Sequence, residues 1–225
     1  LMCGRYSLSK GAKEVGSLFD VVPDTEILGM VYNASPTDTL PVITMQEPSR
    51  LQGKQWGIKC AWGGAKEQLH INARSESVFE KNTFKNLIKT NRCLIPADGF
   101  YEWSGNGRVR QPWRFSLKSG ELFAFAGLYS TIPNQGSGAK AEFCILTTQA
   151  NRIVEPYHNR MPVIILKERA KLWLEESDND ALLPMFTPLD EGLMMVYKVS
   201  PKLNKAGVNY PELINPWHDP ELTLF

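Results

Sequence analysis

The sequence lacks the cysteine and histidine spacing of a metal site or of a disulfide framework. Its four cysteines, at positions 3, 60, 93 and 144, include no C-x-x-C pair, and its three histidines are scattered along the chain. Structural zinc sites need closely spaced thiols or imidazoles, so we expect no metal and no cofactor. Disulfide frameworks are typical of small secreted domains. We therefore interpret Cys93 and Cys144, which lie in apolar segments, as buried core thiols.

Long apolar runs, nucleotide-binding motifs and an excess of one charge are absent too. No run approaches the roughly 20 residues that cross a bilayer, so we expect no membrane association. The chain has neither a Walker-type loop nor a G-x-G-x-x-G motif after a strand pattern. Its first residues do not resemble a secretion signal, which favours a cytoplasmic or DNA-associated protein. The formal net charge is +1, so any contact with nucleic acid must be local.

The patterns that are present indicate many short strands and few helices. Trp113, Phe115 and Leu117 alternate with polar residues, as in a half-buried strand, and Ser104–Gly107 is typical of a hairpin tip. Apolar residues at i, i+3 and i+4 predict helices around 15–19, 84–88 and 170–174. Strands are predicted at 40–45, 54–60, 100–103, 113–117, 122–128, 143–148, 161–166 and 194–199.

These elements predict the fold class. The order of strands and helices lacks βαβ alternation, so we expect an α+β domain with a curved, largely antiparallel β-sheet core and a few short peripheral helices. We expect a single domain over residues 1–225, acting as a monomer. Asn215–Phe225 is predicted to be an irregular tail, and 134–138 a surface loop.

The most reactive group that the sequence can offer is Cys3. As a first residue it would carry a free α-amine beside its thiol, with pKa values of about 8 and 8.5. The amine can form a Schiff base with an aldehyde, and the thiol can then close a five-membered thiazolidine on the same carbon. Proximity makes the second step intramolecular.

Three other segments could support this chemistry. Asn72 and Arg74 lie two positions apart, so in an extended segment they share a face and can bind a carbonyl oxygen and a phosphate. Glu102 lies between aromatic residues in a strand, where desolvation would raise its pKa toward that of a useful acid or base. His158 precedes a buried strand, at a junction of the kind that holds catalytic groups.

Local positive charge and aromatic surface are the remaining candidate features. Three arginines could bind phosphates, namely Arg5, Arg74 and Arg160. Of three tryptophans, Trp56, Trp62 and Trp103, we expect two to pack in the core. His70 and His218 are interpreted as ordinary polar residues.

Taken together, six blocks resemble the SOS-response-associated peptidase (SRAP) family. They run in order over nearly the whole chain: Cys3–Tyr6, Tyr32–Pro36, Trp56–Ile58, Asn72–Glu76, Ile95–Trp103 and His158–Pro162. An N-terminal C-G-R joined with P-A-D-G-F-Y-E-W and H-x-R-M-P is highly specific. The resemblance implies an abasic-site sensor that removes its own initiator methionine. It would then crosslink its new N-terminal cysteine to the aldehyde of an abasic site in single-stranded DNA, including sites at junctions with duplex.

The resemblance also implies roles for particular residues. Cys3 would be the nucleophile, Asn72 would orient the N-terminal group or the sugar, and Glu102 and His158 would transfer protons. The implied DNA-binding residues are Arg5, Arg74, Arg160, Asn33 and Trp62.

Two departures and two alternatives accompany this interpretation. Leu1 and Met2 precede Cys3, and while they remain attached the Cys3 nitrogen is an amide that cannot form a Schiff base. Cys60 stands where the family usually has a proline after Trp-Gly. A cysteine hydrolase of the N-terminal-nucleophile type would use the same thiol on amide bonds. A non-covalent reader of modified or junction DNA would not need the thiol.

Overall fold

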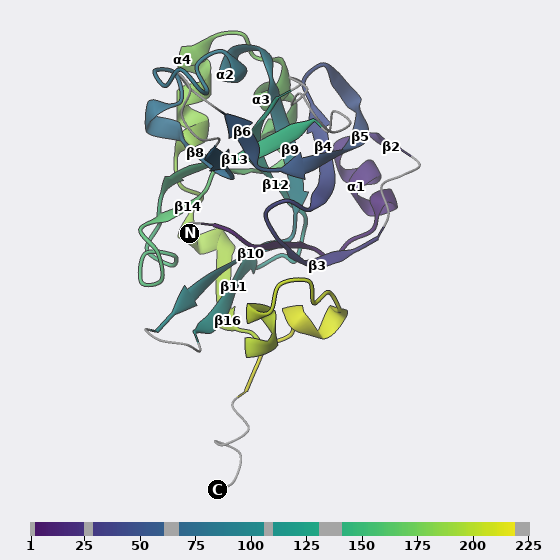
Figure 1. The fold of residues 1–225 in the computed structure, drawn as a ribbon, viewed down its shortest axis with the longest axis vertical. Coiled ribbons are helices and arrows are strands. Elements are labelled where there is room, and N and C mark those ends of the chain that lie inside the picture. Colours follow the sequence, from purple (N-terminus) through teal and green to yellow (C-terminus); the bar gives the residue numbers. More distant parts are fainter. Residues whose placement is uncertain (1–2, 25–28, 61–67, 106–109, 131–140, 219–225) are drawn as a thin grey trace, which may run out of the picture.

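The computed structural model describes residues 3–24, 29–60, 68–105, 110–130 and 141–218. The three predicted helices are present at the periphery as α1 (Ala12–Phe19), α2 (Leu87–Thr90) and α3 (Lys167–Glu175), as Figure 1 shows. α2 is shorter than expected because Phe84 lies in the turn before it. The remaining helical pieces are short: α4 (Asn179–Leu182) and the 3₁₀ turns η1 (Ser75–Ser77), η2 (Leu183–Phe186), η3 (Glu191–Leu193), η4 (Pro201–Asn204) and η5 (Pro211–Ile214).

The smaller of two main sheets is built on the predicted hairpin. Its five strands are antiparallel and follow the order β16 (Met194–Lys198), β11 (Gln111–Leu117), β10 (Gly99–Ser104), β1 (Tyr6–Leu8), β3 (Val31–Ala34). β10 and β11 pair as the two strands of the predicted hairpin, and the predicted tip at Ser104–Gly107 lies partly outside the described residues. β1 brings the start of the chain alongside β10.

The larger sheet curves until it meets itself. Its order is β14 (Arg160–Pro162), β13 (Glu142–Gln149), β12 (Phe123–Ser130), β9 (Arg92–Ala97), β4 (Thr39–Thr44), β5 (Glu47–Trp56), β2 (Val22–Pro23). β15 (Ile164–Ile165) pairs with β12, and β8 (Asn72–Arg74) pairs with β13. Because β13 also pairs with β5, the strands β13, β12, β9, β4 and β5 form a closed ring. The curved, largely antiparallel sheet is confirmed.

Two predicted strands are interrupted. The strand at 54–60 ends at Trp56 and resumes as β6 (Ile58–Cys60), which pairs with β7 (Gln68–His70). Gly57 separates them with a φ of 120°, and a Cβ there would lie 2.6 Å from the Leu69 side chain. That conformation suits glycine alone. The strand at 161–166 divides into β14 and β15 on either side of Val163.

The expected half-buried character of residues 113–117 is wrong. Arg114 and Ser116, which alternate with the apolar residues, are 6% and 5% exposed. The reason is that the second face of β11 is also covered: η4 packs against the strand, and Arg114 forms an ion pair with buried Asp98.

Apolar side chains fill two layers. One cluster lies against α1 and α3 and includes Val15 and Trp173, and the other includes Tyr6, Trp56 and Phe125. Cys93 and Cys144 are fully buried, which confirms their interpretation as core thiols. No helix among the described residues is long and apolar enough to cross a bilayer.

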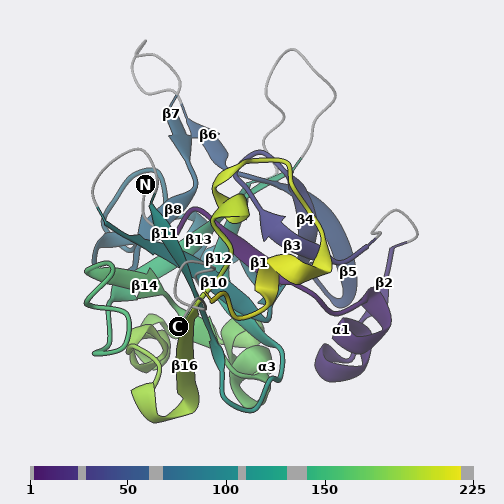
Figure 2. The same ribbon diagram turned by 90° about the horizontal axis from the view of Figure 1, so that it is seen from below.

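The segment after β16 packs against the smaller sheet. Its residues Leu203 and Leu213 form a third apolar cluster with Tyr101 of β10. Figure 2 shows this segment, in yellow, beside β1 and β3. Residues 215–218 have no helix or strand, as predicted for the start of the tail, and the rest of Asn215–Phe225 lies outside the described residues.

Candidate active site

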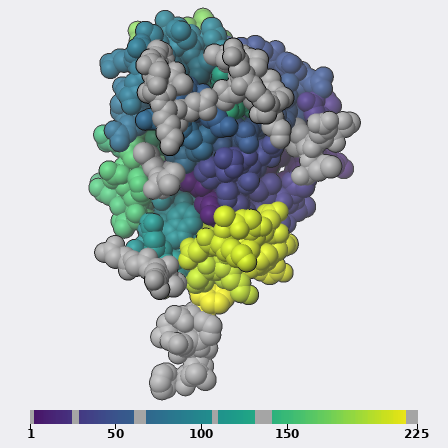
Figure 3. All heavy atoms as spheres, viewed as in Figure 1, coloured from purple at the N-terminus to yellow at the C-terminus, as the bar shows by residue number. Residues whose placement is uncertain are grey.

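Cys3 lies directly before β1 and contacts Glu102 on the neighbouring strand. The main-chain nitrogen of Cys3 donates a hydrogen bond of 2.9 Å to Oε1 of Glu102. Both residues are 2% exposed. Cys3 has a φ of 42°, in the left-handed region that is unfavourable for a residue with a side chain. In Figure 3, atoms of the N-terminal segment, in purple, are visible next to the yellow C-terminal segment.

The environment of Glu102 favours its protonated form. Burial raises the pKa of the Glu102 carboxyl above its ordinary value, and the hydrogen bond from Cys3 and the charge of His158 oppose that shift. A carboxyl with a raised pKa can hold and release a proton near neutral pH. This confirms the expected desolvation of Glu102.

The Cys3 thiol is also held in its protonated form. Burial raises its pKa well above the usual range, and the neighbouring Glu102 raises it further, while the charge of Arg160 acts in the opposite direction. Activated cysteine nucleophiles show the reverse shift, because they work as thiolates. The site therefore holds a neutral thiol beside a nitrogen that contacts an acid.

His158 lies in the loop that leads into β14. Its Nδ1 accepts a hydrogen bond of 3.0 Å from the main-chain nitrogen of Arg160. A ring nitrogen that accepts carries no proton, so neutral His158 has its proton on Nε2. The ring lines a polar hollow of about 580 Å³ together with Arg74, Asn159 and Arg160.

A bidentate ion pair fixes the guanidinium of Arg160. Nη1 and Nη2 of Arg160 bond to the two carboxylate oxygens of Glu76, and Nη2 also donates to the main-chain oxygen of Thr147 at 2.6 Å. The Arg160 side chain is 11% exposed. The hydrogen bonds from Arg160 lower the pKa of Glu76, so this carboxylate remains charged.

Strand pairing brings these groups to one region. β8 and β14 flank the C-terminal half of β13, where Arg74 is level with Thr147 and Arg160 is level with Gln149. Asn72 is half-buried on β8, and Arg74 is exposed. Cys3, Glu102, His158 and Arg160 are joined by the contacts and charge interactions described above.

Arg5 and Asn33 form a separate contact between the smaller sheet and the C-terminal segment. Nη1 of Arg5 donates to Oδ1 of Asn33 at 2.7 Å and to the main-chain oxygen of Leu203 at 3.2 Å. Nδ2 of Asn33 donates to main-chain oxygens of the same segment, including that of Val208 at 3.1 Å. Asn33 is 4% exposed, and its contact with DNA stays a prediction.

The tryptophans differ in setting. Trp56 is fully buried, as expected, while Trp103 is half-buried and donates to Asn204. Trp62 lies outside the described residues. Among the residues that the structure describes, no group of three or more histidine, cysteine or acidic side chains could hold a metal ion.

The sequence analysis did not single out Glu76 or Thr147 as partners of Arg160. Thr147 contributes mainly through its main chain, which no residue type reveals. Glu76 carried one available signal, because it stands two residues after Arg74 in a segment already identified as functional.

The chain is similar to known proteins over most of its length. Residues 2–206 match the family described as SOS response associated peptidase (SRAP). The abasic site processing protein YoqW of Bacillus subtilis is 37% identical over 225 residues, covering 95% of this chain and 99% of YoqW. The abasic site processing protein YedK of Escherichia coli is 30% identical, over 78% of this chain and 80% of its own length.

A solved structure extends the likeness to the fold. A protein from Bacteroides thetaiotaomicron superposes with a TM-score of 0.84 at 25% identity, over 96% of this chain and all of that protein. With a family match over most of its length and a relative at 37% identity, the chain belongs to the SRAP family.

Proposed function

We propose that this protein processes abasic sites by capturing their aldehyde on Cys3 in single-stranded DNA, as a covalent thiazolidine crosslink. The observation that carries the proposal is the 2.9 Å contact between the Cys3 nitrogen and the buried Glu102 carboxyl. Relatives at 37% and 30% identity bear the name abasic site processing protein, which supports the substrate.

The same contact serves removal of Leu1 and Met2. The Cys3 sulfur attacks the carbonyl carbon of Met2 and gives its proton to Glu102, the Met2–Cys3 peptide bond breaks, and Glu102 passes a proton on to the leaving nitrogen. Water then hydrolyses the thioester and frees both the thiol and the Met2 carboxylate. The φ of 42° at Cys3 places backbone strain next to this bond.

Capture of the aldehyde follows on the freed amine. Opening of the deoxyribose ring exposes the aldehyde at C1′, and the Cys3 nitrogen adds to it. Loss of water gives a Schiff base, and the sulfur adds to the same carbon while its proton passes to the nitrogen. Aldehyde and aminothiol thus give thiazolidine and one water, and Glu102 is placed to move the protons at nitrogen.

The remaining candidate residues would position the DNA. Arg74 and Arg160 border the polar hollow beside His158, where they would bind flanking phosphates, and Asn72 would orient the sugar. Arg5, Asn33 and Trp62 would line the path of the strand. An unpaired sugar enters such a site without the cost of unstacking a duplex, which favours single strands, including those at junctions with duplex. The protein would act as a monomer.

The alternative of a cysteine hydrolase is separated by experiment, because it would continue to hydrolyse peptides after Leu1 and Met2 have been removed. The non-covalent reader is separated by experiment, because it would bind DNA equally well after Cys3→Ala.

The test uses protein that begins at Cys3, verified by mass spectrometry, and single-stranded DNA with a natural abasic site. We expect a shifted band on a denaturing gel that survives heating. The band should be absent with a tetrahydrofuran analogue that lacks the aldehyde, with Cys3→Ala, and with protein that retains Leu1 and Met2. No band from the processed wild-type protein would refute the proposal.

A further inference from the structure

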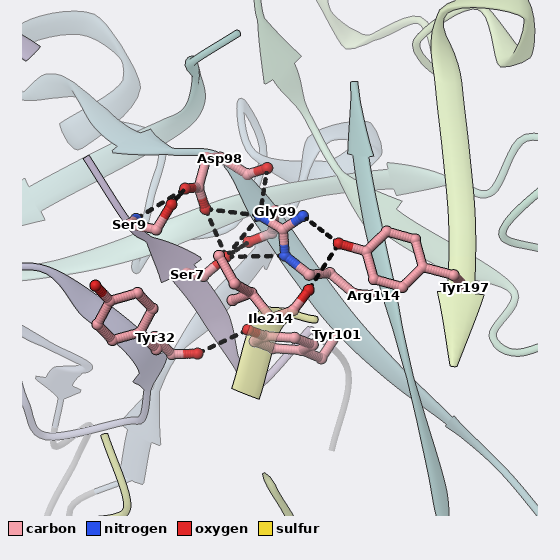
Figure 4. Close-up of polar contacts among 9 residues, drawn as sticks. All are labelled: Ser7, Ser9, Tyr32, Asp98, Gly99, Tyr101, Arg114, Tyr197 and Ile214. Atoms are coloured by element: carbon pink, nitrogen blue, oxygen red, sulfur yellow. Dashed lines mark hydrogen bonds and ion pairs between the residues drawn. The ribbon is translucent and has the colours of Figure 1, made fainter. Parts of the chain in front are cut away.

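A buried polar cluster ties β1 to the hairpin that carries Glu102. It comprises Ser7, Ser9, Asp98, Arg114 and Tyr197, and Figure 4 shows their contacts. None of these residues contacts Cys3 in the hydrogen bonds described above. The cluster nevertheless lies on the strands that bring Cys3 and Glu102 together.

The main-chain pairing of β1 is slight. β1 has three residues, of which two are in register with β10, and its pairing with β3 is irregular between Tyr6 and Leu8. Main-chain nitrogens of Asp98 and Tyr101 donate to the oxygens of Ser7 and Arg5 at 2.9 and 3.1 Å, so a few ladder hydrogen bonds fix this short strand. Since Cys3 stands three residues before β1, a shift of β1 would move the Cys3 nitrogen relative to Glu102.

Asp98 supplies a further constraint through side-chain contacts. Its Oδ1 accepts from Oγ of Ser7 at 2.6 Å and from Nη2 of Arg114 at 3.0 Å. Its Oδ2 accepts from the main-chain nitrogen of Ser9 at 2.8 Å and from the Ser9 hydroxyl. One carboxylate therefore links Ser7 in β1, and Ser9 just after β1, to Arg114 in β11.

Arg114 is itself held on its other side. Nη1 donates to the hydroxyl of Tyr197 at 2.9 Å, and that hydroxyl donates to the main-chain oxygen of Ile214 at 2.9 Å. Arg114 crosses Gly99, where a Cβ would lie 2.7 Å from the guanidinium. Glycine at this position makes room for the ion pair.

A buried ion pair is a costly way to stabilise a fold, since apolar residues of similar volume often do as well. The side chains of Arg114 and Asp98 are 8% and 5% exposed. Their directional bonds, unlike apolar packing, define the position of one strand against another. We infer that Asp98 is a positioning residue that places the Cys3 nitrogen on Glu102, an inference that rests on the proposed function of these two residues.

The first experiment measures position directly in protein that retains Leu1 and Met2. Selective ¹⁵N-cysteine labelling gives signals from four cysteines, and Cys3→Ala identifies that of Cys3. Because the Cys3 amide bonds to Glu102, it should be protected from hydrogen exchange. We expect Asp98→Asn to reduce this protection at least about tenfold, since a lost constraint of this kind shifts reacting groups.

The matched control is Arg92→Lys, which weakens another buried polar cluster, the one that joins β9 to α2 and α3. Arg92 is 1% exposed and donates to main-chain oxygens at Trp173 and Ile88. This variant should lower the melting temperature yet leave Cys3 protected. If Asp98→Asn does not fold, Ser7→Ala removes the link to β1 while keeping the ion pair, and should reduce protection in the same direction.

The second experiment measures crosslinking by processed protein at saturating DNA. Asp98→Asn should slow the reaction about tenfold to a hundredfold without weakening binding to the tetrahydrofuran analogue, and Arg92→Lys should not. Equal Cys3 protection in the Asp98 and Arg92 variants would overturn the inference. Protection that depends on Asp98, combined with a wild type that forms no crosslink, would refute the proposed function and leave the positioning role intact.

Discussion

At the scale of single residues, the site depends on one carboxyl whose proton affinity is set by burial. Glu102 is enclosed by the fold and contacts the nitrogen that would exchange protons in the proposed processing and capture. Burial raises its pKa, so its charge state also affects stability.

Glu102→Gln should change stability with a defined dependence on pH. The folded-state pKa of Glu102 is raised, so its contribution to stability is fully present below the unfolded value of about 4.3 and is lost as pH rises through the folded-state pKa. Glutamine is neutral at every pH, so the variant does not lose this contribution to stability as pH rises. The melting temperature of the variant relative to wild type should therefore increase from about pH 4 toward neutral pH.

Thermal unfolding of protein that retains Leu1 and Met2 checks this. Glu76→Gln provides a comparison of opposite sign, because hydrogen bonds from Arg160 lower the pKa of Glu76. The loss of stability caused by Glu76→Gln should be present at neutral pH and become smaller as pH falls through the lowered pKa of Glu76. A pH-independent difference for Glu102→Gln would contradict the assigned shift.

Substitutions of Glu102 and His158 should affect different steps. Glu102 contacts the Cys3 nitrogen and His158 lines the polar hollow. We expect Glu102→Gln to slow crosslink formation about a hundredfold, the range of general acid–base catalysis, and His158→Gln to slow chiefly reversal. Time courses of formation, and of transfer to fresh DNA, measure both rates. The opposite pattern would reverse the two assignments.

Sequence reasoning could identify Cys3 and Glu102 as candidates because their chemistry is local. An aminothiol at Cys3 or a carboxylate among aromatic residues can be recognised without knowing the fold. The bidentate pairing of Arg160 with Glu76 joins residues 84 positions apart, so it depends on the pairing of β8 and β14 with β13. No local pattern specifies that pairing.

At the scale of elements, length alone does not decide which strands can be predicted. β12 and β13, with eight residues each, were predicted, and β1 and β8, with three each, were not. β9 was also missed although all six of its residues are buried, because Pro96 lies within it. A strand of three residues offers too little alternation to detect. β1 exists because β10 and β3 flank it, which is a tertiary effect.

Arg92 donates hydrogen bonds to main-chain oxygens near the ends of two helices, α2 and α3. The Arg92 guanidinium donates to the main-chain oxygens of Trp173 and, at the end of α2, Ile88, both at 2.7 Å. Arg92→Met would leave these helix-end carbonyls without donors, and we expect a loss of about 3 kcal/mol in the free energy of unfolding.

Chemical denaturation measures this loss, with Lys171→Met as control. Lys171 is a cationic residue on α3 itself. Its side chain is 82% exposed, and its ion pair with Glu175 spans 3.8 Å. Exposed pairs contribute little, so the control should remain close to wild type. Equal effects of the two substitutions would show that Arg92 does not cap the helices.

At the scale of the whole molecule, the balance of charge limits how DNA can be held. With 25 basic and 24 acidic residues, the surface offers no general attraction for a polyanion. In the proposed function, affinity would come from a few arginines, of which Arg74 is exposed beside the hollow and Arg160 is held by Glu76.

Binding of single-stranded DNA should therefore depend only modestly on salt. Each phosphate neutralised contributes about −0.7 to the slope of log K against log salt concentration, so two or three arginines predict a slope of roughly −2. Arg74→Gln removes one of these phosphate contacts, so the slope of log K against log salt concentration should become shallower by about 0.7. The control is Arg50→Gln, which should leave the slope unchanged. Arg50 is an exposed arginine on β5 that forms an ion pair with Asp24. Titrations with the tetrahydrofuran analogue separate these contacts from covalent capture, and a slope much steeper than −4 would mean that a broad surface, rather than the arginines at the site, binds the strand.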